Sequence, residues 1–181
     1  MKRKLVFVAS VLLFVLITGC QLLLTQPVNP HLAMGNPSNA GENPNNYLMI
    51  KPQYALSYSR ERGTPNWVAW QLNQSWLGSI ERQDDFRPDD SLPSDWYRVR
   101  PSDYTGSGYD RGHVVPSADR TATIQDNSAT FLMTNIIPQT PDNNRGAWRE
   151  LEEYCRYLVR QGKELYIIAG VDGKSRKIGR K

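Results

Sequence analysis

One stretch of this chain combines the residue types needed for acid–base chemistry at a phosphate. The stretch Tyr109–Arg120 reads YDRGHVVPSADR and places Asp110, Arg111 and His113 within a few residues of one another. An imidazole titrates near pH ~6.5, so His113 can accept a proton at neutral pH. A base flanked by a carboxylate and a guanidinium indicates chemistry on a phosphate. The second histidine, His31, lies in a segment rich in Pro, Asn and Gln, and we expect it to be solvated and idle.

The residue counts exclude several common site types. With two histidines and two cysteines, the chain can form neither an H-E-x-x-H zinc site nor a cysteine zinc cluster. Neither a phosphate-binding P-loop nor a G-x-S-x-G nucleophile motif is present. A metal, if used, should therefore be a hard cation held by oxygen ligands and water.

Three segments together carry a resemblance to a known family. They are Tyr109–Arg120, 134–139 (TNIIPQ) and 144–148 (NRGAW), followed by Glu152. This pattern resembles the DNA/RNA non-specific endonucleases of the ββα-metal (His-Me finger) superfamily, and is most similar to the sugar-non-specific nucleases of cyanobacteria. The resemblance runs from about Tyr47 to Gly170 and implies an α+β, ββα-metal nuclease fold. Such a fold has a mostly antiparallel central sheet with flanking helices.

The resemblance also implies catalytic roles. His113 corresponds to the general base that activates water, and Arg82 to the arginine that stabilises the pentacovalent phosphate. Asn144 corresponds to the protein ligand of a Mg²⁺ ion, with Mn²⁺ as an alternative, and Glu152 to the residue that holds the metal's waters. Magnesium keeps most of its hydration, so one neutral amide and a nearby carboxylate suffice for it.

The remaining implied residues bind substrate or support the site. Arg111 and Arg156 correspond to arginines that bind neighbouring phosphates. Asp110 and Asn135 correspond to supporting residues, and Asp110 more naturally orients the motif than reacts. Contacts confined to phosphates carry no base information, and no step uses a ribose 2′-hydroxyl, so the expected substrates are both DNA and RNA.

Two other functions remain open from the sequence. The chain could be an inactive or truncated nuclease-like lipoprotein that acts only as a binding module, or a periplasmic phosphodiesterase for small substrates. A proteinaceous nuclease inhibitor is a further partner that the sequence does not reveal. The main reading is a magnesium-dependent, sequence-non-specific endonuclease.

The N-terminus predicts export. Three basic residues precede the apolar run Leu5–Ile17, which is too short to cross a bilayer comfortably and is typical of a signal peptide. The run ends ITGC, which resembles a bacterial lipobox, so residues 1–19 are predicted to be a lipoprotein signal and Cys20 the lipidated residue. An ordinary secretory signal cleaved nearby is the alternative. Either reading gives an exported protein, lipid-anchored in the cell envelope (periplasm) or secreted, and residues 20–46 read as a flexible tether.

The net charge does not itself indicate nucleic-acid binding. The formal charge is +4, but eight of the 22 Lys and Arg residues lie in the signal and in the last eight residues. The body of the chain has fewer basic residues than its 18 acidic ones. Any phosphate site must therefore be a local cluster of arginines.

Hydrophobic patterning predicts the elements of a nuclease domain at 47–171. One strong helix is expected from about Asn144 to Gln161, with Trp148, Leu151, Cys155, Leu158 and Val159 as its apolar stripe. Strands are expected at 54–58, 67–72, 113–115, 129–137 and 164–170, the first two forming a hairpin around a turn at 60–66.

The C-terminal end predicts an incomplete domain. Members of the family continue with further strands, whereas residues 172–181 form a basic tail that cannot supply one. The domain therefore resembles one truncated at the C-terminus, with a hydrophobic sheet edge left open. We expect such a chain to fold poorly and to be weakly active or inactive.

Overall fold

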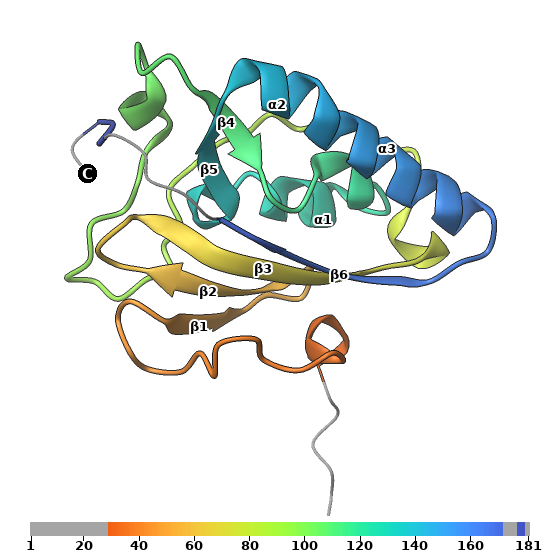
Figure 1. Ribbon diagram of the computed structural model, residues 1–181, viewed down its shortest axis with the longest axis horizontal. Coiled ribbons are helices and arrows are strands. Elements are labelled where there is room, and N and C mark those ends of the chain that lie inside the picture. Colours follow the sequence, from red (N-terminus) through yellow and green to blue (C-terminus); the bar gives the residue numbers. More distant parts are fainter. Residues whose placement is uncertain (1–28, 172–176, 180–181) are drawn as a thin grey trace, which may run out of the picture.

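The computed structural model describes residues 29–171 and 177–179. The predicted signal, Cys20 and most of the basic tail lie outside the described residues. Figure 1 shows two layers, with a sheet at the base and the helices and a smaller sheet on one side of it. Among the described helices, none is both long and apolar enough to cross a membrane.

A four-stranded antiparallel sheet forms the base. Strands β2 (Ala55–Ser59) and β3 (Thr64–Leu72) pair around a turn in which Gly63 adopts a φ of 68°, which confirms the predicted hairpin. Strand β6 (Leu165–Gly170) pairs with the other edge of β3, which confirms the last predicted strand. Strand β1 (Tyr47–Ile50) completes the order β1-β2-β3-β6.

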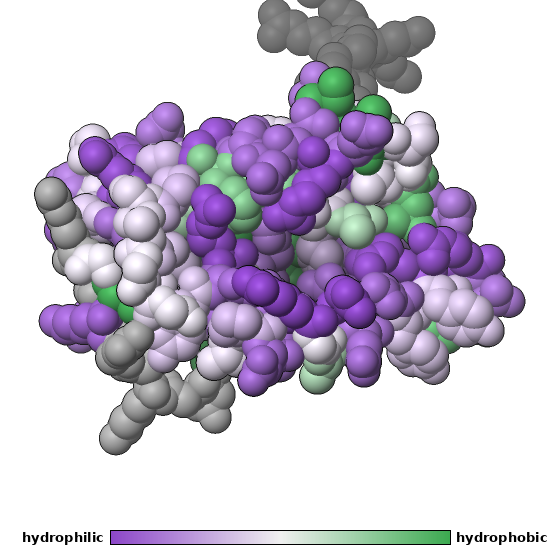
Figure 2. Space-filling model, turned by 90° about the horizontal axis from the view of Figure 1, so that it is seen from above, coloured by the Kyte–Doolittle hydropathy of each residue, from purple (hydrophilic) through white to green (hydrophobic). Residues whose placement is uncertain are grey.

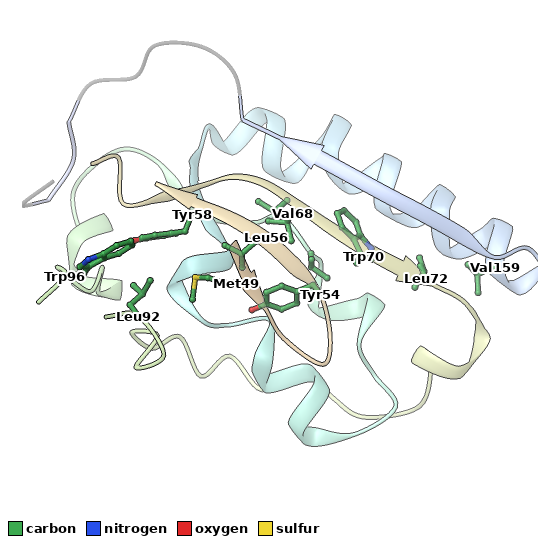
Figure 3. Packing of buried hydrophobic residues seen from close by; sticks show 12 residues of the cluster. Met49, Tyr54, Leu56, Tyr58, Val68, Trp70, Leu72, Leu92, Trp96 and Val159 are labelled. Atoms are coloured by element: carbon green, nitrogen blue, oxygen red, sulfur yellow. The ribbon is translucent and has the colours of Figure 1, made fainter. Parts of the chain in front are cut away.

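The core lies between this sheet and the helices. Because side chains alternate across a strand, one face of β2 and β3 turns a set of large apolar residues toward the helical layer. This set includes Leu56, Val68, Trp70 and Leu72, and Figure 3 shows them in one cluster with Tyr54, just before β2, and with Val159 of the helical layer. Burial of each such side chain contributes about 1.5–3 kcal/mol, so this face attaches the helical layer to the sheet.

The segment 29–46 is folded onto the opposite face, so the prediction of a flexible tether is wrong for these residues. Leu32 and Ala40 pack against Trp67 and Ala69 of β3, and Figure 1 shows the segment, in orange, on the side of the sheet away from the helices. His31 is buried rather than solvated. Its Nδ1 accepts a hydrogen bond from the Gln71 amide at 3.1 Å, and its Nε2 lies 2.8 Å from the Pro52 carbonyl oxygen.

A second, two-stranded sheet carries the motif histidine. Strand β4 (Asp110–His113) pairs antiparallel with β5 (Ile136–Gln139), with His113 opposite Ile136. The strand predicted at 113–115 therefore lies three residues too late. Gly112 faces the side chain of Gln139 so closely that a Cβ atom there would overlap it, which explains why glycine precedes the histidine.

The run 129–137 is not one buried strand, contrary to the prediction. It begins at the end of helix α1 (Ile124–Ala129), whose first turn is capped by Thr123 accepting the Asp126 amide. A 3₁₀ turn, Met133–Asn135, follows before β5 begins. An apolar run of this length cannot by itself distinguish a strand from buried turns.

The predicted helix 144–161 is two helices. Helix α2 (Pro141–Arg145) ends at Gly146, where the backbone leaves helical geometry, and α3 (Ala147–Arg160) begins immediately afterwards. The predicted stripe is only partly buried, since Val159 is in the core but Leu151 is exposed. Asn144 therefore belongs to α2 and Glu152 to α3, so the two residues do not lie on one continuous helix.

Strand β6 forms one edge of the sheet within the described residues. Leu165, Ile167 and Ala169 point into the core, whereas Tyr166 and Ile168 are exposed on the other face. The open hydrophobic sheet edge expected of a truncated domain stays a prediction. The expectations of poor folding and weak activity stay predictions.

Candidate active site

His113 stands at the end of β4 inside an aromatic enclosure. Its ring centroid lies 5.3 Å from that of Phe86 and 4.8 Å from that of Phe131. The residue is only 8% exposed, and its Nε2 has no hydrogen-bond partner among the described residues. Burial, and then the positive charges of Arg82 and Arg111, together lower the pKa of His113 to about 3. The imidazole is therefore neutral at neutral pH, as a general base must be.

Asn135 fixes the backbone that follows the histidine. Its Oδ1 accepts the Val115 amide at 2.9 Å, and its Nδ2 donates to the carbonyl oxygens of Val115 at 3.0 Å and Thr130 at 2.9 Å. The Val114 amide donates to the Asn135 carbonyl oxygen. Because Asn135 is fully buried, these bonds hold the end of β4 in one position.

Two arginines lie on the aromatic rings around His113. The guanidinium carbon of Arg111 is 4.1 Å from the Phe86 ring centroid, and that of Arg82 is 4.7 Å from the Phe131 centroid. Arg82 also donates to Ser117 Oγ at 2.9 Å and pairs with Asp84 at 3.3 Å. The structure thus brings Arg82, Arg111 and His113 together, as the resemblance implied.

Asp110 joins the histidine strand to α2. Its Oδ2 accepts Asn144 Nδ2 at 2.9 Å, and its two oxygens accept Arg145 Nε at 2.8 Å and Nη2 at 2.7 Å. The hydrogen bond from Arg145, and then that from Asn144, hold the pKa of the Asp110 carboxyl below its usual value. Because the Asn144 amide nitrogen faces Asp110, its oxygen is left as the atom that can bind a cation.

A cavity of about 490 Å³ connects these groups. Its walls come from β4, from the end of α2, from the Arg82 segment and from the 3₁₀ turn Pro101–Tyr104. His113 does not line it and lies directly behind Phe86, which does. Figure 2 shows that the surface seen from above the helical layer is dominated by hydrophilic residues. The lining residues are Arg82, Asp84, Phe86, Pro101, Ser102, Tyr104, Thr105, Tyr109, Asp110, Arg111, Asn144 and Arg145.

Glu152 lies on α3, outside the cavity lining. Burial raises the pKa of its carboxyl to about 7, while the Arg156 guanidinium opposes this shift and the Asp119 carboxylate adds to it. Trp148, one turn earlier on α3, donates its indole Nε1 to the His113 carbonyl oxygen at 3.2 Å. The helix that carries Glu152 is therefore attached directly to the histidine strand.

Arg156 is not brought to the cavity. Its Nη1 donates to Asp119 Oδ1 at 2.9 Å, and its side chain is 10% exposed. Asp119 is itself buried and also accepts the indole N–H of Trp70 at 3.0 Å. In this structure the arginine assigned to a neighbouring phosphate links α3 to η4 (Ser117–Asp119) and the sheet.

Sequence reasoning missed four residues that shape the site. Phe86 and Phe131 enclose His113, Asp119 pairs with Arg156, and Arg145 lines the cavity beside Asn144. Asp119 and Arg145 both lie within the quoted motifs, so their position in the chain was a signal. The two phenylalanines carried none, because nothing local relates them to the histidine.

A metal would have few protein ligands here. Within the described ranges, no group of three His, Cys, Asp or Glu side chains is placed to hold an ion. The Asn144 amide oxygen is a ligand of the kind that hard cations accept, with water completing the shell. The residues present therefore fit a hydrated hard cation and do not fit zinc.

Comparison with known proteins places the chain among nucleases. The family model described as DNA/RNA non-specific endonuclease matches residues 29–180. A nuclease of Nostoc sp. is 61% identical over 173 residues, which cover 89% of this chain and 63% of that protein. The mitochondrial endonuclease G of Homo sapiens is 36% identical over 138 residues, covering 71% of this chain and 46% of that protein.

A solved structure supports the same relationship. A chain in the crystal structure of the EndoG/EndoGI complex, which concerns the mechanism of EndoG inhibition, superposes with a TM-score of 0.68 at 28% identity. The match covers 77% of this chain and 56% of the other. The present chain thus spans between about half and two thirds of the length of these relatives. Their shared fold is the α+β, ββα-metal nuclease fold.

Proposed function

Since the chain belongs to the DNA/RNA non-specific endonuclease family, we propose that it is a metal-dependent endonuclease that hydrolyses the phosphodiester bonds of DNA and RNA. The observation that carries the proposal is the neutral imidazole of His113, enclosed by Phe86 and Phe131 next to a cavity whose lining includes Arg82, Arg111 and Asn144. A neutral base, two cations for a phosphate and an amide oxygen for a metal are the parts that phosphodiester hydrolysis requires.

His113 takes the proton of the attacking water in this mechanism. In the free protein the pKa of His113 is low because of burial and then because of Arg82 and Arg111. A phosphate bound by the two arginines neutralises their charge, so substrate binding makes the imidazole a stronger base when it is needed. Arg82 and Arg111 also stabilise the added negative charge of the pentacovalent phosphate.

Asn144 is the residue that would hold a magnesium ion, with manganese as an alternative, and Glu152 would hold its waters. The bound ion would supply a polarised phosphate oxygen and an acidic water for the leaving group. Asp110 keeps the Asn144 amide oriented through the hydrogen bond from Nδ2. This arrangement supports the proposal that metal binding requires the Asp110 carboxylate as well as Asn144.

The cavity supports action on both DNA and RNA. Its basic residues, Arg82, Arg111 and Arg145, are arginines suited to phosphates, and phosphate contacts carry no sequence information. Hydrolysis by an activated water does not need a 2′-hydroxyl.

Incubation of the purified chain with plasmid DNA and with ribosomal RNA, in magnesium and in EDTA, tests the proposal. We expect both polymers to be cut in magnesium and spared in EDTA. Binding of plasmid without cutting would instead identify a binding module. Hydrolysis of bis(4-nitrophenyl) phosphate with both polymers left intact would identify a phosphodiesterase for small substrates.

Export and lipidation at Cys20 are proposed from the sequence alone. Replacement Cys20→Ser in the bacterial host should abolish labelling by palmitate and release the chain from membranes. Retention of label would contradict lipidation at this residue. A proteinaceous inhibitor is a further proposal, supported by the inhibitor complex of the similar EndoG, and addition of EndoGI to the cleavage assay tests it.

A further inference from the structure

Arg145 lies at the cavity in a geometry suited to a ligand. Its side chain is 71% exposed, and it lines the cavity together with Arg82 and Arg111. Asp110 grips the guanidinium through Nε and Nη2, at 2.8 and 2.7 Å, which fixes the direction of the planar group. A guanidinium has five N–H donors, so this grip leaves three for another acceptor.

The Asp110 carboxylate does not depend on Arg145 alone for hydrogen-bond donors. Asp110 also accepts the Asn144 amide, and its side chain is near the surface with solvent access. Exposed ion pairs of this kind add little to stability. The pair is therefore better explained by what it orients than by what it stabilises.

Arg156 provides the contrast. Its guanidinium is buried against Asp119 and does not line the cavity, so it presents no donor to a phosphate in this structure. Arg145 is the arginine that the fold places beside Asn144, with its free donors at the cavity.

We propose that Arg145 binds a phosphate of the substrate strand adjacent to the scissile one, next to Asn144. This inference rests on the proposed function. Asp110 acts as the positioning residue for Arg145 and Asn144 together. The substrate strand then passes across the cavity from the Arg82 and Arg111 side to the end of α2.

The salt dependence of DNA binding tests this role. Binding of a short fluorescent duplex is measured by anisotropy in EDTA, across about 50 to 200 mM KCl, where each phosphate contact contributes about 0.9 to the slope of log affinity against log salt. Arg145→Ala should reduce the magnitude of this slope by about 0.9, the amount expected for the loss of one phosphate contact. Arg149→Ala, an exposed arginine of α3 outside the cavity lining, is the matched control and should leave the slope unchanged.

A second pair of variants shows whether Arg145 contacts a phosphate directly or only neutralises the charge of Asp110. Arg145→Ala leaves the Asp110 carboxylate uncovered, so the comparison is repeated between Asp110→Asn and the double variant Asp110→Asn, Arg145→Ala. The same loss of slope in this background supports a direct contact. A loss that disappears shows that Arg145 only neutralises Asp110, and overturns the proposal.

The two proposals fail in different ways. A parent chain that binds the duplex and cuts plasmid, with an unchanged slope in Arg145→Ala, overturns the phosphate contact alone. A parent chain that binds the duplex without cutting overturns the nuclease, while its salt slopes still decide the role of Arg145. A parent affinity that does not depend on salt overturns the phosphate contact, and the plasmid assay still decides the nuclease separately.

Discussion

The molecule contains two arginine–carboxylate pairs in opposite settings. Arg145 and Asp110 meet at an open cavity with the guanidinium exposed, whereas Arg156 and Asp119 meet inside the domain with both groups enclosed. Burying an ion pair costs desolvation free energy, and removing one partner then leaves an uncompensated buried charge. An exposed pair adds little stability, and its guanidinium keeps N–H donors for a ligand. The same two residue types therefore serve the packing of α3 in one region and the orientation of a site in the other.

The largest expected effect on activity comes from the histidine of the open region. His113→Ala should lower kcat by about 10²- to 10⁴-fold, the range for loss of a general base. Duplex binding should change little, because His113 lies behind Phe86 rather than on the cavity surface. Steady-state cleavage of plasmid, with binding measured on the same preparation, checks this. Parent-like turnover would remove His113 from the mechanism.

The buried pair should dominate stability. Asp119→Ala leaves the Arg156 guanidinium and the Trp70 indole N–H without their acceptor, and breaking a buried pair costs about 3–5 kcal/mol. Asp84→Ala, which breaks the exposed pair with Arg82, should cost less than about 1 kcal/mol. Urea unfolding of both variants measures the difference. Equal losses would show that burial does not distinguish the two regions.

The sequence could predict those parts of the fold and the site that depend on interactions between residues near one another in the chain, or on the resemblance. The hairpin, β6 and the grouping of His113 with Arg82 and Arg111 were predicted, because periodicity, turn residues and motif spacing are local or carried by the resemblance. The break at Gly146 was not, since a glycine inside a helical pattern is often tolerated.

Other misses came from distant contacts. His31 was expected to be idle, but the Gln71 amide, forty residues away, binds it. Arg156 was assigned to a phosphate through the resemblance, whereas in the structure it pairs with Asp119 of another element. A partner supplied by tertiary folding leaves no signal at local spacing.

Glu152 lies on the same helix as Arg156, outside the cavity lining, and its replacement should give an intermediate effect on activity. Glu152→Gln should slow turnover by about 10- to 100-fold, the range for residues that support a metal site. The matched control is Glu153→Gln, an exposed neighbour that pairs with Arg149. Single-turnover cleavage in saturating magnesium distinguishes the two, and equal rates would argue against a role for Glu152.

The raised pKa of Glu152 also predicts a pH dependence of stability. The raised pKa keeps this proton on the folded state up to about pH 7, whereas an unperturbed glutamate releases it near pH 4.5. Its contribution is therefore complete below pH 4.5 and is lost as the pH rises through 7, by on the order of 2–3 kcal/mol. Urea unfolding in EDTA should show a flatter pH profile for Glu152→Gln than for the parent. His31 and His113, with lowered pKa values, act in the opposite sense in both proteins.

The last of these effects concerns the metal requirement. Asn144→Ala should raise the magnesium concentration for half-maximal activity by roughly 10-fold or more, because the amide oxygen is lost. Asn143→Ala, its exposed neighbour in α2, should not. Magnesium titrations of the two variants check this, and coincident titrations would assign the metal elsewhere.

Cleavage of DNA and RNA strands of the same sequence, by the parent and by His113→Ala side by side, tests the central claim most directly. We expect His113 to activate the water at a site that contacts only the phosphates of the substrate. The parent should then cut both strands in magnesium, and His113→Ala should lose both cleavage rates by the same factor. Cleavage of RNA alone, or loss of only one of the two activities in His113→Ala, would contradict the account.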